Sequence, residues 1–154
     1  MKVDLQPRGL GISVPPGLFD FREKRDSMQR KIAVIACVLA MIGVGLGAFG
    51  SHMLGDKIGA DALETFQTGI QYHFIHALAM LIVAVAMGVW GESRRLAWAA
   101  WLFLAGIVMF SGSLYLLSTT GLRIFGPITP LGGAAFIAGW IVLALAVGKK
   151  NASH

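Results

Sequence analysis

The sequence predicts an all-α protein that crosses a lipid bilayer four times, as a polytopic four-transmembrane-helix bundle. Of its 154 residues 56% are hydrophobic and only 14% are charged, whereas about a quarter are charged in a typical soluble domain. Four stretches contain no charged residue: 32–52, 74–91, 96–122 and 124–148. Each is close to the ~20 apolar residues that a helix needs to cross the hydrocarbon layer. The alternation typical of β-barrel strands is absent, so these spans should be helices.

The N-terminal segment differs in composition from the rest. Val14-Pro-Pro-Gly17 interrupts regular structure, and residues 1–27 lack the apolar core of a signal peptide. Met28 is followed by two basic residues and then by the first apolar stretch, as at a natural start. We therefore expect residues 1–27 to be a disordered or dispensable tail and residues 28–148 to form the membrane domain. Residues 149–154 would be a short basic cytoplasmic tail.

Basic residues at the ends of the spans predict the orientation of the chain. With four spans both termini lie on the same side of the membrane. That side would hold six basic residues next to the spans, namely Arg30, Lys31, Arg94, Arg95, Lys149 and Lys150. The other side would hold two, Lys57 and Arg123. Because cytoplasmic loops carry an excess of Lys and Arg, we expect both termini to face the cytoplasm, with the protein in the cytoplasmic (inner) membrane.

Small residues recur at helical spacing in the first and last spans. The first span carries Ala33, Ala36, Ala40, Gly43, Gly47 and Gly50, and the last carries Gly132, Gly133, Ala135, Gly139 and Ala146. The third span has a small cluster of its own, Ser111, Gly112 and Ser113. Small side chains let helix backbones approach closely in lipid. These residues are predicted to pack helices within the bundle, or to form the seam of a homo-oligomer.

Two segments outside the apolar spans have a predicted structure. Residues 60–71 should form a short outer helix, which either lies at the membrane surface or runs straight into the second span. Its acidic first turn suits the helix dipole. Pro127 and Pro130 fit the first turn of a helix and resist its interior, so they mark where the last span begins.

Polar side chains meet an apolar stretch where the second span begins. Tyr72 and His76 lie one turn apart on one helix face, with Gln71 beside them, while His73 points elsewhere. His52, at the outer end of the first span, could be level with them. Polar groups at membrane depth are costly and usually face the bundle interior. His52, Gln71, Tyr72 and His76 therefore form the candidate polar site.

Four functional classes can be weighed against this site. Three or four ligands are needed to hold zinc, and no Cys or second Glu joins the histidines, so we expect no metal and no cofactor. A pathway for protons or small solutes through His52, Tyr72 and His76 is possible, although no charged residue lies within the spans. No nucleophile lies at a usable spacing from a base, so we do not expect the protein to be an enzyme. The net charge of +5 comes from residues that orient helices, and we expect no nucleic-acid partner.

Four ordered motifs carry a resemblance to a known family. They are Leu46-Gly-Ala-Phe-Gly-Ser-His52, Gln67-Thr-Gly-Ile-Gln-Tyr-His-Phe-Ile-His76, Phe110-Ser-Gly-Ser-Leu-Tyr-Leu-Leu117, and Ile128-Thr-Pro-Leu-Gly-Gly133 with Gly139-Trp140. Over residues 28–148 the chain resembles the bacterial domain-of-unknown-function family 423, related to the eukaryotic transmembrane protein 256. Two positions depart from the family pattern, which often has alanine at position 51 and often lacks histidine at position 73.

The resemblance implies a small four-span protein of the cytoplasmic membrane with no assigned activity. Together with the residues, it favours a structural, assembly or accessory membrane component. The lipid bilayer is the expected partner, with a homo-oligomer or another membrane protein as a further one. The alternative is permeation of protons or small solutes through the candidate polar site.

Overall fold

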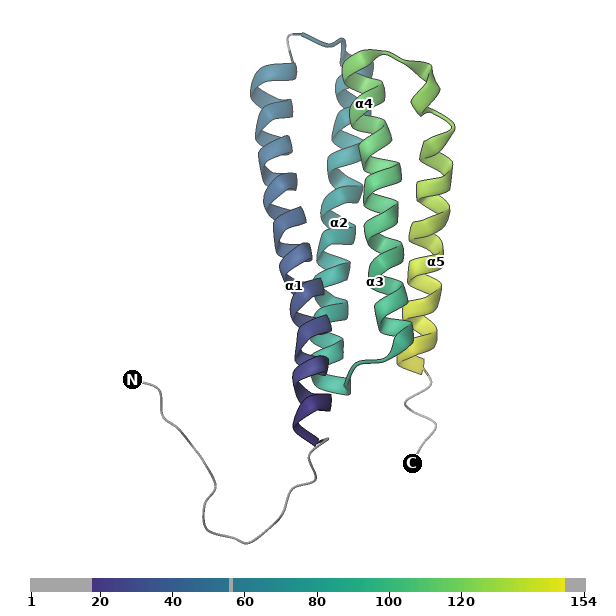
Figure 1. The fold of residues 1–154 in the computed structure, drawn as a ribbon. Coiled ribbons are helices and arrows are strands. Elements are labelled where there is room, and N and C mark those ends of the chain that lie inside the picture. The colour runs from purple at the N-terminus through teal and green to yellow at the C-terminus, as the bar shows by residue number, and fades with distance from the viewer. Residues whose placement is uncertain (1–17, 56, 149–154) are drawn as a thin grey trace, which may run out of the picture.

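The structure is a computed structural model that describes residues 18–55 and 57–148, and within these ranges it forms four long rods side by side (Figure 1). The first rod is α1 (Leu18–Phe49), extended by the π-helical turn η1 (Gly50–Leu54), and the second is α2 (Ala60–Trp90). The third comprises α3 (Arg94–Gly106), the π-helical turn η2 (Ile107–Ser111) and α4 (Gly112–Thr120). The fourth is α5 (Ile128–Gly148), preceded by the 3₁₀ turn η3 (Arg123–Phe125). All four are long and apolar enough to cross a membrane, as predicted.

The first rod begins earlier than the predicted boundary at Met28. The α1 helix starts at Leu18, directly after Val14-Pro-Pro-Gly17. No proline or glycine lies between Leu18 and Met28, and adding turns to an existing helix is much easier than nucleating one. Residues 18–27 are therefore helical in the structure, whereas a dispensable segment before Met28 stays a prediction. Residues 1–17 and 149–154 lie outside the described residues.

The second rod shows which arrangement the outer segment adopts. Residues 60–71 continue without a break into the span, because α2 is a single helix from Ala60 to Trp90. The continuous helix places His73 and His76 near its middle rather than at one end. Half of the most apolar window of α2 is buried, against 17% in the first and fourth rods. The second rod is therefore the centre of the protein, and both histidines lie at its centre.

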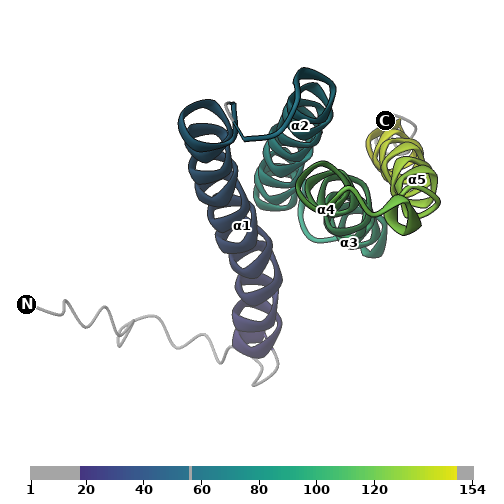
Figure 2. The same cartoon turned by 90° about the horizontal axis from the view of Figure 1, so that it is seen from above.

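The rods form an open row rather than a closed square (Figure 2). The α1 helix packs mainly on α2, α2 also packs on α3 and α4, and α5 packs on α3 and η2. The largest fully buried apolar side chains are Phe66, Phe103, Ile32, Met80, Met87 and Val83. The small-residue faces of the first and last spans therefore meet different neighbours, not each other. Apolar side chains such as Met41 and Ile137 remain exposed, as expected of residues that face lipid.

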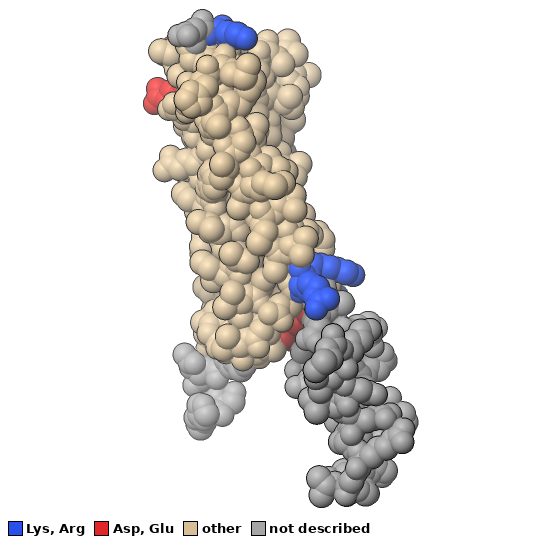
Figure 3. Space-filling view, turned by 90° about the vertical axis from the view of Figure 1, so that its left-hand side faces the viewer, with Lys and Arg blue, Asp and Glu red and all other residues tan. Residues whose placement is uncertain are grey.

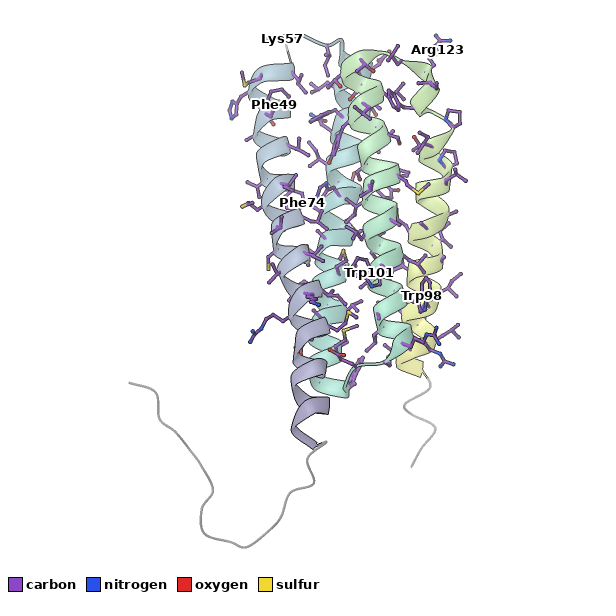
Figure 4. The ribbon with its side chains drawn as sticks, viewed as in Figure 1. Phe49, Lys57, Phe74, Trp98, Trp101 and Arg123 are labelled. Atoms are coloured by element: carbon purple, nitrogen blue, oxygen red, sulfur yellow. The ribbon has the colours of Figure 1, made fainter. Side chains whose placement is uncertain are left out.

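Four of the seven predicted packing glycines lie closely against an aromatic residue of another helix. A methyl group at Gly43 would lie 3.0 Å from the ring of Phe74, which reaches toward α1 (Figure 4). The same test gives 2.9 Å to Phe66 at Gly50 and 2.7 Å to Phe103 at Gly139, and at Gly132 a methyl group would overlap the backbone of Phe110. Two further close contacts with aromatic rings were not predicted, Gly69 against Tyr115 and Gly106 against Phe136. Aromatic side chains of one helix thus fill the space that glycines leave on the next.

Three of the predicted packing glycines do not make such contacts. A methyl group at Gly47 or Gly112 would meet no atom within 4 Å, and one at Gly133 would reach Phe110 only at 3.8 Å. Gly47 and Gly112 therefore do not pack closely within the chain, and for them the seam of a homo-oligomer stays a prediction. Both lie on faces of their helices that no neighbouring helix approaches.

Charged side chains lie near the two ends of the rods. On the face seen in Figure 3 an uncharged belt separates them. At the end where α3 begins, a carboxylate oxygen of Glu92 accepts the backbone N–H of Gln29 at 2.9 Å, and Ser93 Oγ accepts that of Leu96 at 3.2 Å. At the opposite end Gly121 adopts φ +70° and its N–H bonds to Leu117, which ends α4. The belt between the two ends matches the hydrocarbon layer of a membrane.

Candidate functional site

His73 joins three helices in the interior. Its side chain is only 3% exposed. Nε2 lies 2.9 Å from the carbonyl oxygen of Leu39 on α1, and Nδ1 lies 3.3 Å from the hydroxyl of Tyr115 on α4. A carbonyl oxygen only accepts, so Nε2 carries the ring proton. A charged ring is too costly at this buried position, so Nδ1 accepts and the Tyr115 hydroxyl donates to it.

His76 makes a second connection one turn further along α2. It is also 3% exposed, and its Nδ1 lies 2.8 Å from the carbonyl oxygen of Tyr72. Nδ1 therefore carries the proton and donates to that oxygen. Nε2 accepts from the indole N–H of Trp140 on α5 at 3.2 Å. The ring stacks on Phe136, with centroids 3.4 Å apart and planes 10° apart.

The two histidines are thus neutral, in opposite tautomers, with both nitrogens of each ring hydrogen-bonded. An unpaired polar group in hydrocarbon costs roughly several kcal/mol. A membrane interior therefore requires that both nitrogens of each ring have a hydrogen-bond partner. His73 links α2 to α1 and α4, while His76 links α2 to α5. Together they connect all four rods through the central one.

The structure brings together only part of the predicted polar site. Tyr72 and His76 stack with ring centroids 6.1 Å apart. His52 lies in η1 and is exposed, as is Gln71, and among the described residues no hydrogen bond connects either to Tyr72 or His76. The expectation that His52 is level with His76 is therefore corrected: η1 ends the first rod, and His76 is central.

Sequence reasoning missed His73 and Tyr115. It placed His73 outside the polar site, whereas its ring is as buried as that of His76. The structure shows the face that the two histidines share, because most buried residues of α2 follow one another at steps of one, three or four: Phe66, Gly69, His73, His76, Ala77, Met80, Val83, Ala84 and Met87. This is the spacing of one helix face. Both histidines lie on this face.

No group of three or more His, Cys, Asp or Glu side chains that could hold a metal occurs within the described part of the chain. The histidine nitrogens are occupied by Leu39, Tyr115, Tyr72 and Trp140 as described above. A metal at either ring would have to displace one of these partners. The arrangement suits helix packing better than ligation.

The two serines of the third rod differ in their hydrogen bonding. Ser113 Oγ donates to the carbonyl oxygen of Phe110 at 2.8 Å and lies 2.8 Å from the hydroxyl of Thr129 on α5. Ser111, at the end of the π-helical turn η2, is fully buried and its Oγ has no partner. A buried hydroxyl without a partner is a cost to stability.

We expect Ser111→Ala to leave the free energy of unfolding unchanged or to raise it by up to about 1 kcal/mol. The matched variant Ser113→Ala loses the bond to Thr129 and should cost about 0.6 kcal/mol or more. Thermal unfolding of both variants in the same detergent measures the difference. A loss of stability in Ser111→Ala as large as in Ser113→Ala would contradict the assignment of an unpaired hydroxyl.

Four apolar helices joined by buried, neutral hydrogen bonds define a small four-span integral membrane protein. The family described as "Protein of unknown function (DUF423)" has a model that matches residues 46–133. The chain belongs to this family. No solved structure matches the chain significantly.

The match covers almost the whole length of two relatives, whose names state only that they are membrane proteins. The chain is 47% identical over 116 residues to the "UPF0382 membrane protein YwdK" of Bacillus subtilis, covering 75% of this chain and 94% of the relative. It is 42% identical over 132 residues to the "UPF0382 inner membrane protein YgdD" of Escherichia coli, covering 82% of this chain and 98% of the relative. The activity of the family is not given by these names.

Proposed function

We propose that the protein is a structural, assembly or accessory component of its membrane rather than a channel, transporter or enzyme. The observation that carries this proposal is the complete pairing of His73 and His76. Their four ring nitrogens bond to groups on the four rods, so the polar side chains at membrane depth act as connections between helices. With these partners in place, neither ring presents an unoccupied donor or acceptor to a passing solute.

The alternative, permeation of protons or small solutes, meets an obstacle at His76. Its Nε2 accepts from Trp140, and an indole N–H can only donate. A proton arriving at Nε2 would have to break that bond and remove the ring from its partner. His52 and Gln71 would have to extend the pathway outward, and neither is hydrogen-bonded to Tyr72 or His76.

The proposed location is the cytoplasmic membrane, with both termini in the cytoplasm. Basic residues flanking the spans are more numerous on the side of the termini than on the side of Lys57 and Arg123. The name of the E. coli relative places that protein in the inner membrane.

A homo-oligomer can be detected through Cys37, which is the single cysteine and is exposed. Disulfide cross-linking in native membranes would join two copies of the chain at this residue.

Reconstitution into vesicles containing a pH-sensitive dye tests the proposal. Wild-type vesicles should dissipate an imposed pH gradient no faster than protein-free vesicles. His76→Ala should leave this rate unchanged and lower the thermal stability in detergent, whereas His52→Ala should change neither. Proton flux in the wild type that disappears in a stably folded His76→Ala variant would overturn the proposal in favour of permeation. The accessory role further predicts a stoichiometric membrane protein that co-purifies after mild extraction.

A further inference from the structure

A surface cavity lies beside the first turns of α3. It has a volume of about 360 Å³ and is lined by Arg94, Ala97, Trp98 and Trp101. Ala97, Trp98 and Trp101 follow Arg94 by three, four and seven positions, so the four residues lie on one face of the helix. Figure 4 shows Trp98 and Trp101 on the part of α3 nearest the end of the bundle where α1 begins and α5 ends.

The lining combines one fixed positive charge with two broad apolar surfaces. Trp98 and Trp101 are 56% and 45% exposed, and the small side chain of Ala97 beside them leaves room for a flat or linear apolar group. Arg94 is exposed at the end of the uncharged belt, where lipid headgroups begin. A guanidinium binds a phosphate through two parallel hydrogen bonds, which an ammonium cannot do.

The surrounding charges favour an anion at this position. Arg95 is the next residue, and the nearest acidic residue in the sequence, Glu92, accepts a hydrogen bond from the backbone of Gln29. An occupant must therefore carry a negative group for Arg94 and an apolar chain for the tryptophan surfaces. In a membrane protein, phospholipid supplies both from its ordinary surroundings.

We propose that this cavity binds one anionic phospholipid, with its phosphate on Arg94 and an acyl chain against Ala97, Trp98 and Trp101. Phosphatidylglycerol has this chemistry. Phosphatidylcholine has the same phosphate but also a quaternary ammonium, which Arg94 and Arg95 repel. The site would thus select a headgroup by charge and hold the lipid by its chain.

Native mass spectrometry of the purified protein with added phosphatidylglycerol or phosphatidylcholine tests the site. The wild type should retain phosphatidylglycerol in preference to phosphatidylcholine, and Arg94→Gln should weaken phosphatidylglycerol binding about tenfold. The matched control Arg95→Gln removes the same charge from a residue that does not line the cavity, and its loss should be clearly smaller. Trp98→Ala should weaken both lipids, because the chain contact is common to them.

Three results would overturn the proposal. They are equal losses in Arg94→Gln and Arg95→Gln, no loss in Arg94→Gln, and displacement of the lipid by an equal concentration of inorganic phosphate. Equal losses would mean that charge near the surface acts without a site. Unchanged unfolding temperatures in the absence of added lipid establish that each variant is folded. The proton-flux assay is unaffected by this site, so the two proposals can fail separately.

Discussion

Gly132→Ala should destabilise the protein more than any other single methyl addition in the last span. The added carbon would overlap the backbone of Phe110 in η2, and a backbone cannot rotate away as a side chain can. Overpacking of this kind costs about 1–3 kcal/mol, and alanine recovers about 0.5–1 kcal/mol through its better helix propensity. We expect a net loss of up to about 2.5 kcal/mol, measured by thermal unfolding in detergent.

The neighbouring glycine provides the control. A methyl group at Gly133 would lie 3.8 Å from the ring of Phe110, an ordinary contact distance. Gly133→Ala should therefore be neutral or slightly stabilising, since only the gain in helix propensity remains. Equal destabilisation of the two variants would show that α5 does not approach η2 at Gly132.

His76→Ala should have the largest effect among the polar residues of the interior. It removes a ring stacked on Phe136 and leaves the indole N–H of Trp140 without its acceptor. Truncating a buried ring of this size costs about 3 kcal/mol or more. A fall in the free energy of unfolding in detergent or lipid is the expected result.

A second variant separates the hydrogen bond from the packing of the ring. Trp140→Phe removes the donor and should cost about 0.6–1.7 kcal/mol. In the His76→Ala background this hydrogen bond is already absent, so Trp140→Phe should lower the free energy of unfolding little further. Such non-additivity is expected of residues in direct contact. Strictly additive losses would contradict the bond between Trp140 and His76.

The existence and number of the helices could be predicted from the sequence because they depend on local properties. Each apolar stretch has the length of a membrane span, and prolines mark the start of α5 near Pro127 and Pro130. The beginning of α1 at Leu18 was not predicted, since membrane-span length says nothing about how far a helix continues into water. The family resemblance is confirmed by the family match and by the relatives, but it did not predict which residues of different helices contact one another.

Which helices meet could not be predicted, for a reason specific to membranes. In water the buried face of a helix is apolar and the exposed face polar, but in lipid both faces are apolar. In α5 the buried Phe136 and Leu143 alternate with equally apolar exposed residues such as Ile137 and Ile141. The pattern therefore did not identify the interior face, and His73 was assigned to the wrong side of α2.

The same limit applies to the glycines that are predicted to pack helices. Small residues mark where a close approach is possible, but the approaching group lies on another helix far away in the sequence. Gly43 meets Phe74, and Gly139 meets Phe103, while Gly47 meets nothing within the chain. Only the assembled structure distinguishes these positions.

The central claim is that the membrane-embedded histidines are neutral, fully paired connections between helices. Nitrogen-15 NMR of histidine-labelled protein in lipid bilayers measures it directly, using a variant in which His52 and His154 are replaced by Gln. The structure predicts two neutral rings in opposite tautomers, with the proton on Nε2 in His73 and on Nδ1 in His76. Two rings in the same tautomer, or a ring that is doubly protonated at neutral pH, would contradict it.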